Sequence, residues 1–263
     1  LSALTAKASC PMTFAGLNYL DGIFLNRFLT AKNAGGRTLL DAVSEPKSVL
    51  KTVAHLIRSE ERVTISSILS NLKFVSRTPG HFFPGAAAGV WRAHAPPGLP
   101  VCDPFLGWGG RTLGAVCAGV SRIVGCDLQE ESVSGCFSIV SDFSSLSSTD
   151  GSFHITDSLE FLQRTDDKFG MIFTSPPFMD TEDYGTQSDS MRQDWIESFV
   201  LPFVQACRSR LAPGGRLALH LKDVKGAPTF TAYHMAALGA GFKQIAKHKY
   251  GRSWTQSVYV YAL

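Results

Sequence analysis

The chain has 263 residues, of which 44% are hydrophobic and 18% are charged. This composition excludes a disordered, coiled-coil or collagen-like protein and is typical of one large packed domain or of a medium domain with a smaller one. No run approaches the ~18 apolar residues that a spanning helix requires, and no basic-then-apolar leader is present. We therefore expect neither a membrane span nor a secretory signal.

Charge is unevenly distributed along the chain. Residues 1–97 contain 11 Lys/Arg and 5 Asp/Glu, whereas residues 98–263 contain 14 Lys/Arg and 17 Asp/Glu. A basic segment joined to a mildly acidic remainder favours contact with a polyanion such as nucleic acid, although ordinary surface lysines explain it equally well.

The six cysteines form no C-x-x-C pair, and they lie in apolar, strand-like contexts such as Val-Cys-Asp and Gly-Cys-Asp. We expect reduced, mostly buried thiols of an intracellular protein and no zinc or other metal site. The sequence does not distinguish cytoplasm, nucleus and organelle matrix.

The first part of the chain is predicted to be helical. Apolar residues at spacings of three and four predict helices over residues 17–29, 47–58 and 64–72. Pro/Gly turns at residues 78–80 and 95–100 follow. We place a domain boundary near residue 97, with a basic, mainly helical region over residues 1–97 and a second domain over residues 98–263.

Strands and helices then alternate. Strands are predicted to end near residues 103, 127 and 157 and to cover residues 170–175, 216–221, 242–249 and 257–262. Helices are predicted over residues 111–119, after residue 127, and over residues 195–211 and 233–239. This alternation predicts an open, mostly parallel α/β sheet. The two closing strands, with no helix between them, predict one antiparallel strand.

The first motif, DPFLGWGG, runs from Asp103 to Gly110. A strand ends in an acid and is followed by a glycine turn and a helix, which in a doubly wound sheet is where ligands bind. Glycines let the backbone approach a ligand, and the helix N-terminus faces it. The spacing is not G-x-G-x-x-G, which disfavours a dinucleotide, and a glycine turn without a ligand is the alternative.

Asp127 ends the next predicted strand. An acid at this place can accept hydrogen bonds from both hydroxyl groups of a ribose. The alternative is that it only caps the following helix.

The third motif is TSPPF, from Thr174 to Phe178. Two prolines cannot continue a strand ladder, so the strand stops and a stiff loop follows. The loop presents the Ser175 hydroxyl, the Pro176 carbonyl and the Phe178 ring, which together suit a planar amine. An ordinary structural loop is the alternative.

Taken together, the three motifs resemble those of the S-adenosylmethionine (SAM)-dependent amino methyltransferases, which methylate cytosine N4 or adenine N6 in DNA. The resemblance covers roughly residues 80–263 and continues through the segment 180–185 and the Pro-Gly-Gly turn at residues 213–215. It implies a class I, Rossmann-like methyltransferase sheet with SAM as the cofactor. Residues 1–75 resemble no family that we can name.

The resemblance also implies roles for individual residues. Asp103 and the glycine turn would hold the methionine part of the cofactor. Asp127 would bind its ribose hydroxyls, and Asp157 would bind its adenine amino group. The full set of implied cofactor-binding residues is Asp103, Phe105, Gly107, Gly109, Gly110, Asp127, Asp157 and Thr174. Ser175 and the Pro176 carbonyl would accept hydrogen bonds from the target amine, Pro177 would stiffen the loop, and Phe178 would stack on the base. A serine at the first loop position favours cytosine N4.

Two features depart from the family pattern. Phe178 stands where tyrosine is more usual, and no long insertion serves as a target-recognition domain. Recognition would then fall to the basic N-terminal third or to a protein partner. Candidate nucleic-acid contacts are Arg77, Arg92, Arg111, Lys222 and Tyr184.

The histidines, His220 among them, show no spacing typical of a metal site or a catalytic base. Two other functions stay open: methylation of an amino group in RNA, and a catalytically silent subunit of a larger nucleoprotein assembly.

Overall fold

The protein is described by a computed structural model that covers residues 16–32, 35–76, 80–177, 195–222, 229–250 and 256–263. The chain divides into two compact units, one formed by Leu1–Leu20 and His81–Leu263 and the other by Asp21–Gly80. No helix in these described ranges is long and apolar enough to cross a membrane.

The smaller unit is helical. Its helices are α2 (Leu25–Thr30), α3 (Leu39–Ser44), α4 (Pro46–Arg58) and α5 (Ile65–Ser76), and α1 (Leu17–Ile23) leads into it. Helix α3 begins with a capping box in which the Thr38 hydroxyl accepts from the Asp41 amide at 3.0 Å and the Asp41 carboxylate accepts from the Thr38 amide at 2.8 Å. The predicted helix over residues 17–29 is thus two helices that meet at Phe24. Helix α3 was not predicted.

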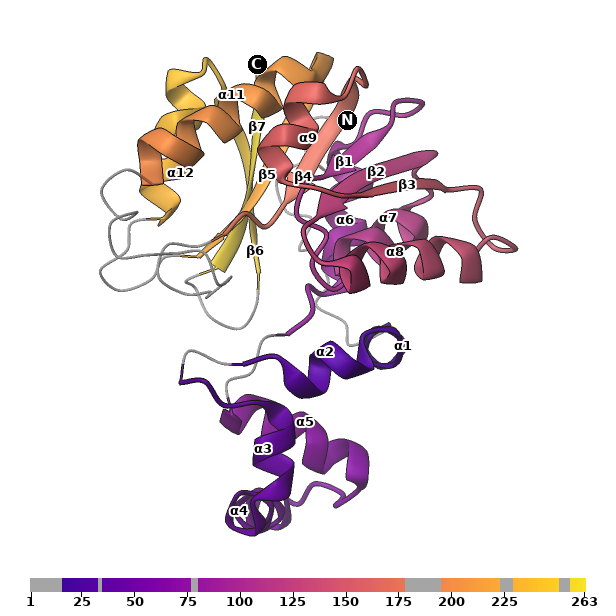
Figure 1. Cartoon of the computed structure of the whole chain (residues 1–263), viewed down its shortest axis with the longest axis vertical. Helices are drawn as coiled ribbons and strands as arrows, with labels where there is room; N and C mark the ends of the chain where they lie inside the picture. Colours follow the sequence, from indigo (N-terminus) through magenta and orange to yellow (C-terminus); the bar gives the residue numbers. More distant parts are fainter. Residues whose placement is uncertain (1–15, 33–34, 77–79, 178–194, 223–228, 251–255) are drawn as a thin grey trace. The chain divides into compact units, whose positions relative to one another are not determined.

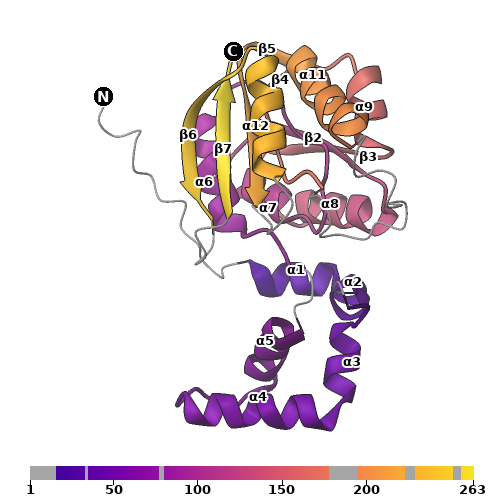
Figure 2. The same cartoon turned by 90° about the vertical axis from the view of Figure 1, so that its left-hand side faces the viewer.

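The larger unit contains a seven-stranded sheet with the order β3-β2-β1-β4-β5-β7-β6 (Figures 1 and 2). Its strands are β1 (Val101–Asp103), β2 (Arg122–Asp127), β3 (Asp150–Ile155), β4 (Phe169–Thr174), β5 (Leu211–Lys222), β6 (Lys243–Lys249) and β7 (Gln256–Ala262). Strands β1 to β5 are parallel, and β7 runs antiparallel to both β5 and β6. The prediction of a mostly parallel sheet with one antiparallel strand near the C-terminus is confirmed.

Helices cover both faces of this sheet (Figure 1). One face packs against α6 (Pro84–His94), α7 (Gly110–Ala118) and α8 (Glu130–Asp142). The other packs against α9 (Ser158–Arg164), α11 (Leu201–Arg210) and α12 (Thr229–Gly239), with a π-helical turn η1 (Ile196–Val200) before α11. Strands β1 and β4 are buried along their whole length, as expected when helices cover both faces.

The domain boundary predicted near residue 97 is wrong, because α6 packs against the sheet and is part of the larger unit. Ala87, Val90 and Trp91 of α6 share one buried cluster with Val101 of β1 and Ala115 of α7. The compact units therefore divide between Gly80 and His81. The amphipathic pattern of α6 is weak because four of its eleven residues are alanine and two are glycine, so the sequence did not predict this helix.

Five cysteines lie in the described part of the chain, and all five are free thiols. Cys102, Cys126, Cys136 and Cys207 are buried, whereas Cys117 is exposed. Burial raises the pKa of the Cys136 thiol to about 12. The prediction of unpaired, mostly buried thiols is confirmed for these residues.

Candidate active site

An ion pair fixes the carboxyl end of β1. The Asp103 side chain is fully buried, and its Oδ2 accepts a hydrogen bond from Arg111 Nε of α7 at 2.8 Å. Its Oδ1 accepts from the Thr174 hydroxyl, at the end of β4, at 2.7 Å. Burial raises the pKa of the Asp103 carboxyl, and the Arg111 guanidinium opposes that rise. This network ties β1, β4 and α7 together at the edge where the motifs meet.

The network gives Asp103 a role that the sequence did not predict. Its carboxylate accepts hydrogen bonds from two side chains of the protein itself, Arg111 and Thr174, and holds them in place. Contact of Asp103 or Thr174 with a cofactor stays a prediction.

The glycine turn lies directly above this anchor. Gly107 has φ 55° and Gly109 has φ 66°, a left-handed conformation that favours glycine. Among the described residues, a Cβ added to Gly107 would meet nothing closer than the Phe105 carbonyl oxygen at 4.0 Å, so this part of the structure leaves room beside its Cα. The Gly107 amide donates to Asp127 Oδ2 at 2.8 Å, which ties the turn to the end of β2.

Gly110 has a different reason to be glycine. A Cβ at this position would lie 2.1 Å from the carbonyl oxygen of Phe82, in the segment before α6. Close packing of that segment therefore requires glycine here, and a cofactor contact for Gly110 stays a prediction.

Phe105 is half-buried, and its ring centre lies 5.4 Å from that of Phe203 in α11.

Two further carboxylates lie after neighbouring strands. Asp127 ends β2, is partly buried, and also accepts from the Gln129 amide at 3.0 Å. Asp157 is exposed and caps α9, where its Oδ1 accepts from the Leu159 and Glu160 amides at 2.8 and 3.1 Å. Since both follow parallel strands, they lie at the same sheet edge as the glycine turn.

The proline loop leaves the same edge from β4. Ser175 is partly buried, and its Oγ lies 2.9 Å from Nδ1 of His220 in β5. Pro176 is buried, and the Pro177 carbonyl accepts from the buried Tyr233 hydroxyl at 3.5 Å. Ser175 directly follows Thr174, whose hydroxyl contacts Asp103, so the proline loop begins at the Asp103 anchor.

His220 is the site residue that sequence reasoning missed. Nothing in its local spacing distinguishes it from the other histidines. The signal lies in the strand order, because β5 pairs with β4 in a register that aligns Leu219 with Thr174. The next residues of the two strands are then His220 and Ser175.

Two of the candidate nucleic-acid contacts, Arg111 and Arg92, are engaged elsewhere in the structure. Arg111 is buried in the ion pair with Asp103, so its predicted phosphate contact is wrong. Arg92 donates to the Cys117 carbonyl in the last turn of α7, where a cation is favourable. A helix of nine residues is about 13 Å long, and this end is opposite the glycine turn. Arg92 is therefore not brought to the site.

Four predicted residues cannot be located in this way. Arg77, Phe178 and Tyr184 lie outside the described residues. Lys222 is the last residue of β5, and its side chain is likewise outside the described part.

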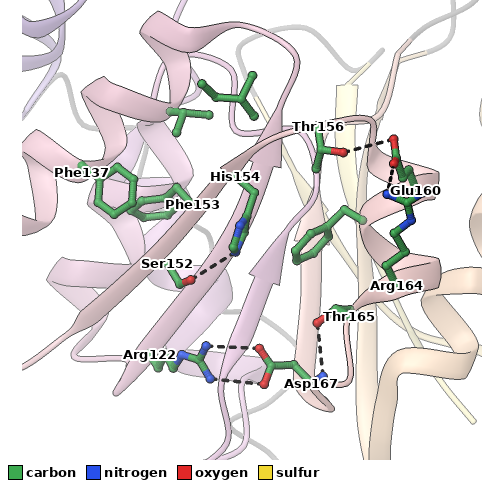
Figure 3. Close-up of a pocket in the computed structure, with 13 residues that line it drawn as sticks. Arg122, Phe137, Ser152, Phe153, His154, Thr156, Glu160, Arg164, Thr165 and Asp167 are labelled. Carbon is green, nitrogen blue, oxygen red and sulfur yellow. Dashed lines mark hydrogen bonds and ion pairs between the residues drawn. The ribbon is translucent and has the colours of Figure 1, made fainter.

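A separate groove lies along the outer edge of the sheet at β3 (Figure 3). Its lining includes Phe137 of α8, His154 of β3 and Phe161 of α9, and Arg122 pairs with Asp167 at 3.2 Å beside it. Ser175 and the glycine turn are not part of its lining.

No family model matches the chain, and no curated protein matches it either. Among solved structures, it is similar to TrmN from Thermus thermophilus with a TM-score of 0.51 and 23% identity, over 68% of this chain and 48% of that one. It thus spans about half the length of the TrmN structure.

Two further solved structures are similar to the chain. A methyltransferase from Pyrococcus furiosus has a TM-score of 0.50 and 14% identity, over 68% of this chain and 82% of that one. Magnesium protoporphyrin IX methyltransferase (ChlM) from Synechocystis PCC 6803, solved with bound SAM, has a TM-score of 0.50 and 15% identity, over 76% of this chain and 85% of that one. At such identities the likeness concerns the fold, and the chain has the class I methyltransferase fold.

Proposed function

We propose that this protein transfers a methyl group from SAM to the exocyclic amino group of a nucleic-acid base, with cytosine N4 or adenine N6 of DNA as the preferred targets. The observation that carries the proposal is that the proline loop begins beside the glycine turn: Ser175 follows Thr174, whose hydroxyl donates to Asp103, and Asp103 pairs with Arg111 directly after the turn. The shared methyltransferase fold supports SAM as the methyl donor.

The residues at the sheet edge fit this cofactor. The open space beside Gly107 lets a ligand approach the backbone of the turn. Asp127, at the end of β2, is the acid that would accept hydrogen bonds from the ribose hydroxyls, and Asp157 would accept from the adenine amino group. When bound, SAM supplies an electrophilic methyl group on a sulfonium sulfur.

The chain's own residues then act on the amine. The lone pair of an exocyclic amino group is delocalised into the base, which makes the nitrogen a poor nucleophile. Hydrogen bonds from its two hydrogens to Ser175 Oγ and the Pro176 carbonyl favour a tetrahedral nitrogen and free that lone pair for in-line attack on the methyl group. The N–C bond would form as the S–C bond breaks, the sulfur would leave as a neutral thioether, and the nitrogen would release one proton to water. Stacking of Phe178 on the base, worth about 1–3 kcal/mol, stays a prediction because Phe178 lies outside the described residues.

Access to the target has its own cost. A base in a duplex must leave the stack, at a cost of a few kcal/mol, whereas a single-stranded target is already available.

The unit Asp21–Gly80 contains nine Lys/Arg and five Asp/Glu, and we assign to it the contact with the phosphate backbone, alone or with a protein partner. The free thiols of the sheet unit suit the reducing interior of a cell.

The test is transfer of labelled methyl from SAM to DNA and to RNA, with the modified nucleoside identified by mass spectrometry. We expect N4-methylcytosine or N6-methyladenine, and we expect Ser175→Ala to lower the rate about 10- to 100-fold because one hydrogen bond to the reacting amine is lost. Ser138→Ala, an exposed serine of α8, is the matched control and should leave the rate unchanged.

Each other outcome has a definite meaning. Modification of RNA alone would replace the DNA target with an RNA amine. SAM binding without transfer to either polymer would contradict the proposal and favour a silent subunit.

A further inference from the structure

The Ser175–His220 contact joins two strands at the proposed catalytic loop. Ser175 Oγ and His220 Nδ1 lie 2.9 Å apart, which is a normal hydrogen-bond length. His220 is 6% exposed, so water does not compete freely for this contact. The two residues are 45 positions apart in sequence and meet only because β4 and β5 are neighbours.

Aromatic rings fix the plane of the His220 imidazole. The Phe82 ring packs edge-on against it with centres 5.1 Å apart, and the Tyr250 ring does so at 4.4 Å. Phe82 and Tyr250 also stack on each other at 4.4 Å, and the Tyr250 hydroxyl accepts from the Phe83 amide at 2.9 Å. A ring held from two sides keeps Nδ1 directed at the Ser175 hydroxyl.

The neighbours of His220 come from several elements. Among them are Ser175, which follows β4, Phe82 before α6 and Tyr250 after β6. The Arg111 guanidinium of α7, which pairs with Asp103, lies over the Phe82 ring 5.4 Å from its centre.

A neutral imidazole determines which way the hydroxyl points. A serine hydroxyl has one hydrogen to donate and two lone pairs to accept with. If Nδ1 takes the hydrogen, a lone pair of Oγ is left for a hydrogen of the target amine. If Nδ1 carries a proton instead, it occupies one lone pair and turns the hydroxyl hydrogen away from itself, toward the amine.

We propose that His220, protonated at Nε2 and accepting at Nδ1, is a positioning residue that holds the Ser175 hydroxyl ready to accept from the target amine. This inference rests on the proposed function and deepens it. His220 does not touch the substrate, and its effect passes through Ser175.

The test compares methyl transfer by the wild type, His220→Asn and His220→Leu over a range of pH. Asn keeps an acceptor near the position of Nδ1 but cannot titrate, whereas Leu offers no acceptor. His154→Asn, an exposed histidine of β3, is the matched control.

We expect His220→Leu to lower kcat about tenfold with little change in KM, the effect of one lost hydrogen bond. His220→Asn should recover most of the rate. The wild-type rate should fall at acid pH, because a protonated imidazole cannot accept, and this fall should be absent in the Asn variant.

Several results would overturn the inference. Equal rates for wild type and Leu would do so, as would equal losses in Asn and Leu, which would indicate packing alone. An acid fall that persists in Asn would also refute it. If the Leu variant does not fold, the comparison of wild type with Asn decides.

A second readout does not depend on turnover. Nitrogen NMR of the wild-type protein should find a neutral His220 with its proton on Nε2. A proton on Nδ1 in an active enzyme would overturn this inference alone, whereas a wild type that methylates neither polymer would overturn the proposed function and with it the role of the pair.

Discussion

At the scale of single residues, the site is held by polar groups that are buried in pairs. Asp103 is fully buried, and leaving it without partners would cost several kcal/mol. Arg111 and Thr174 supply its charge partner and a hydroxyl donor. The same contacts align the ends of β1 and β4, so the geometry of the site and the stability of the sheet depend on the same atoms.

Replacing Thr174 tests this anchor. Thr174→Val removes the hydroxyl that donates to Asp103 at 2.7 Å, and we expect the free energy of unfolding to fall by about 1–3 kcal/mol. Thr174→Ser keeps the hydroxyl and loses one methyl group, so its loss should stay near 0.8 kcal/mol. Urea denaturation of the two variants measures the difference, and equal losses would show that the hydroxyl contributes nothing.

At the scale of elements, α6 and α7 pack so closely that glycine is required between them. A Cβ at Gly114 would lie 2.4 Å from the Ala87 Cβ and 2.9 Å from the backbone nitrogen of Ala88. The segment that leads into α6 approaches Gly110 equally closely. These contacts place Phe82 beside His220, so packing of α6 is part of how the site is built.

Gly114→Ala should therefore destabilise the sheet unit. Overpacking typically costs about 1–3 kcal/mol. The gain in helix propensity is at most about 1 kcal/mol. Gly239→Ala in α12 is the matched control, because a Cβ there meets nothing within 4 Å, and thermal unfolding should show no loss. A Gly114→Ala protein as stable as the wild type would mean that α6 can shift without cost.

At the scale of the whole molecule, a buried histidine pair joins distant parts of the sheet unit. His94 ends α6 and His248 lies on β6, with their Nε2 atoms 2.7 Å apart. Arg216 of β5 donates to the His94 carbonyl at 3.0 Å. Burial, together with His248 and Arg216, lowers the pKa of His94 to about 4.

This pair predicts a loss of stability in mild acid. The unfolded chain binds a proton at His94 near pH 6.5, whereas the folded protein binds it only near pH 4, so the free energy of unfolding falls as pH decreases through this window. The slope from one group is at most about 1.4 kcal/mol per pH unit.

Urea denaturation between pH 7 and pH 4 measures this dependence. His94→Gln should reduce the slope, whereas His154→Gln, at an exposed position of β3, should not. An unchanged slope in His94→Gln would exclude the pair as its source.

The class of the sheet and the three motifs at its carboxyl edge were predictable from the amino-acid sequence. Alternating apolar strands and helices, the glycine turn and the double proline are local signals, because each depends on residues a few positions apart. The positive φ of Gly107 and Gly109 is a local property of this kind, because a tight turn needs it, whereas their contact with a cofactor stays a prediction.

The partners of those motifs, in contrast, are set by contacts between elements that are distant in the sequence. The tertiary structure placed α6 with the sheet, set β7 between β5 and β6, paired Asp103 with Arg111 and brought His220 to Ser175. These contacts join elements far apart in the chain, and they depend on strand order and on what must be buried together. A local sequence pattern does not indicate which distant residue a side chain will contact. The role of His220 therefore follows only from the pairing of β5 with β4.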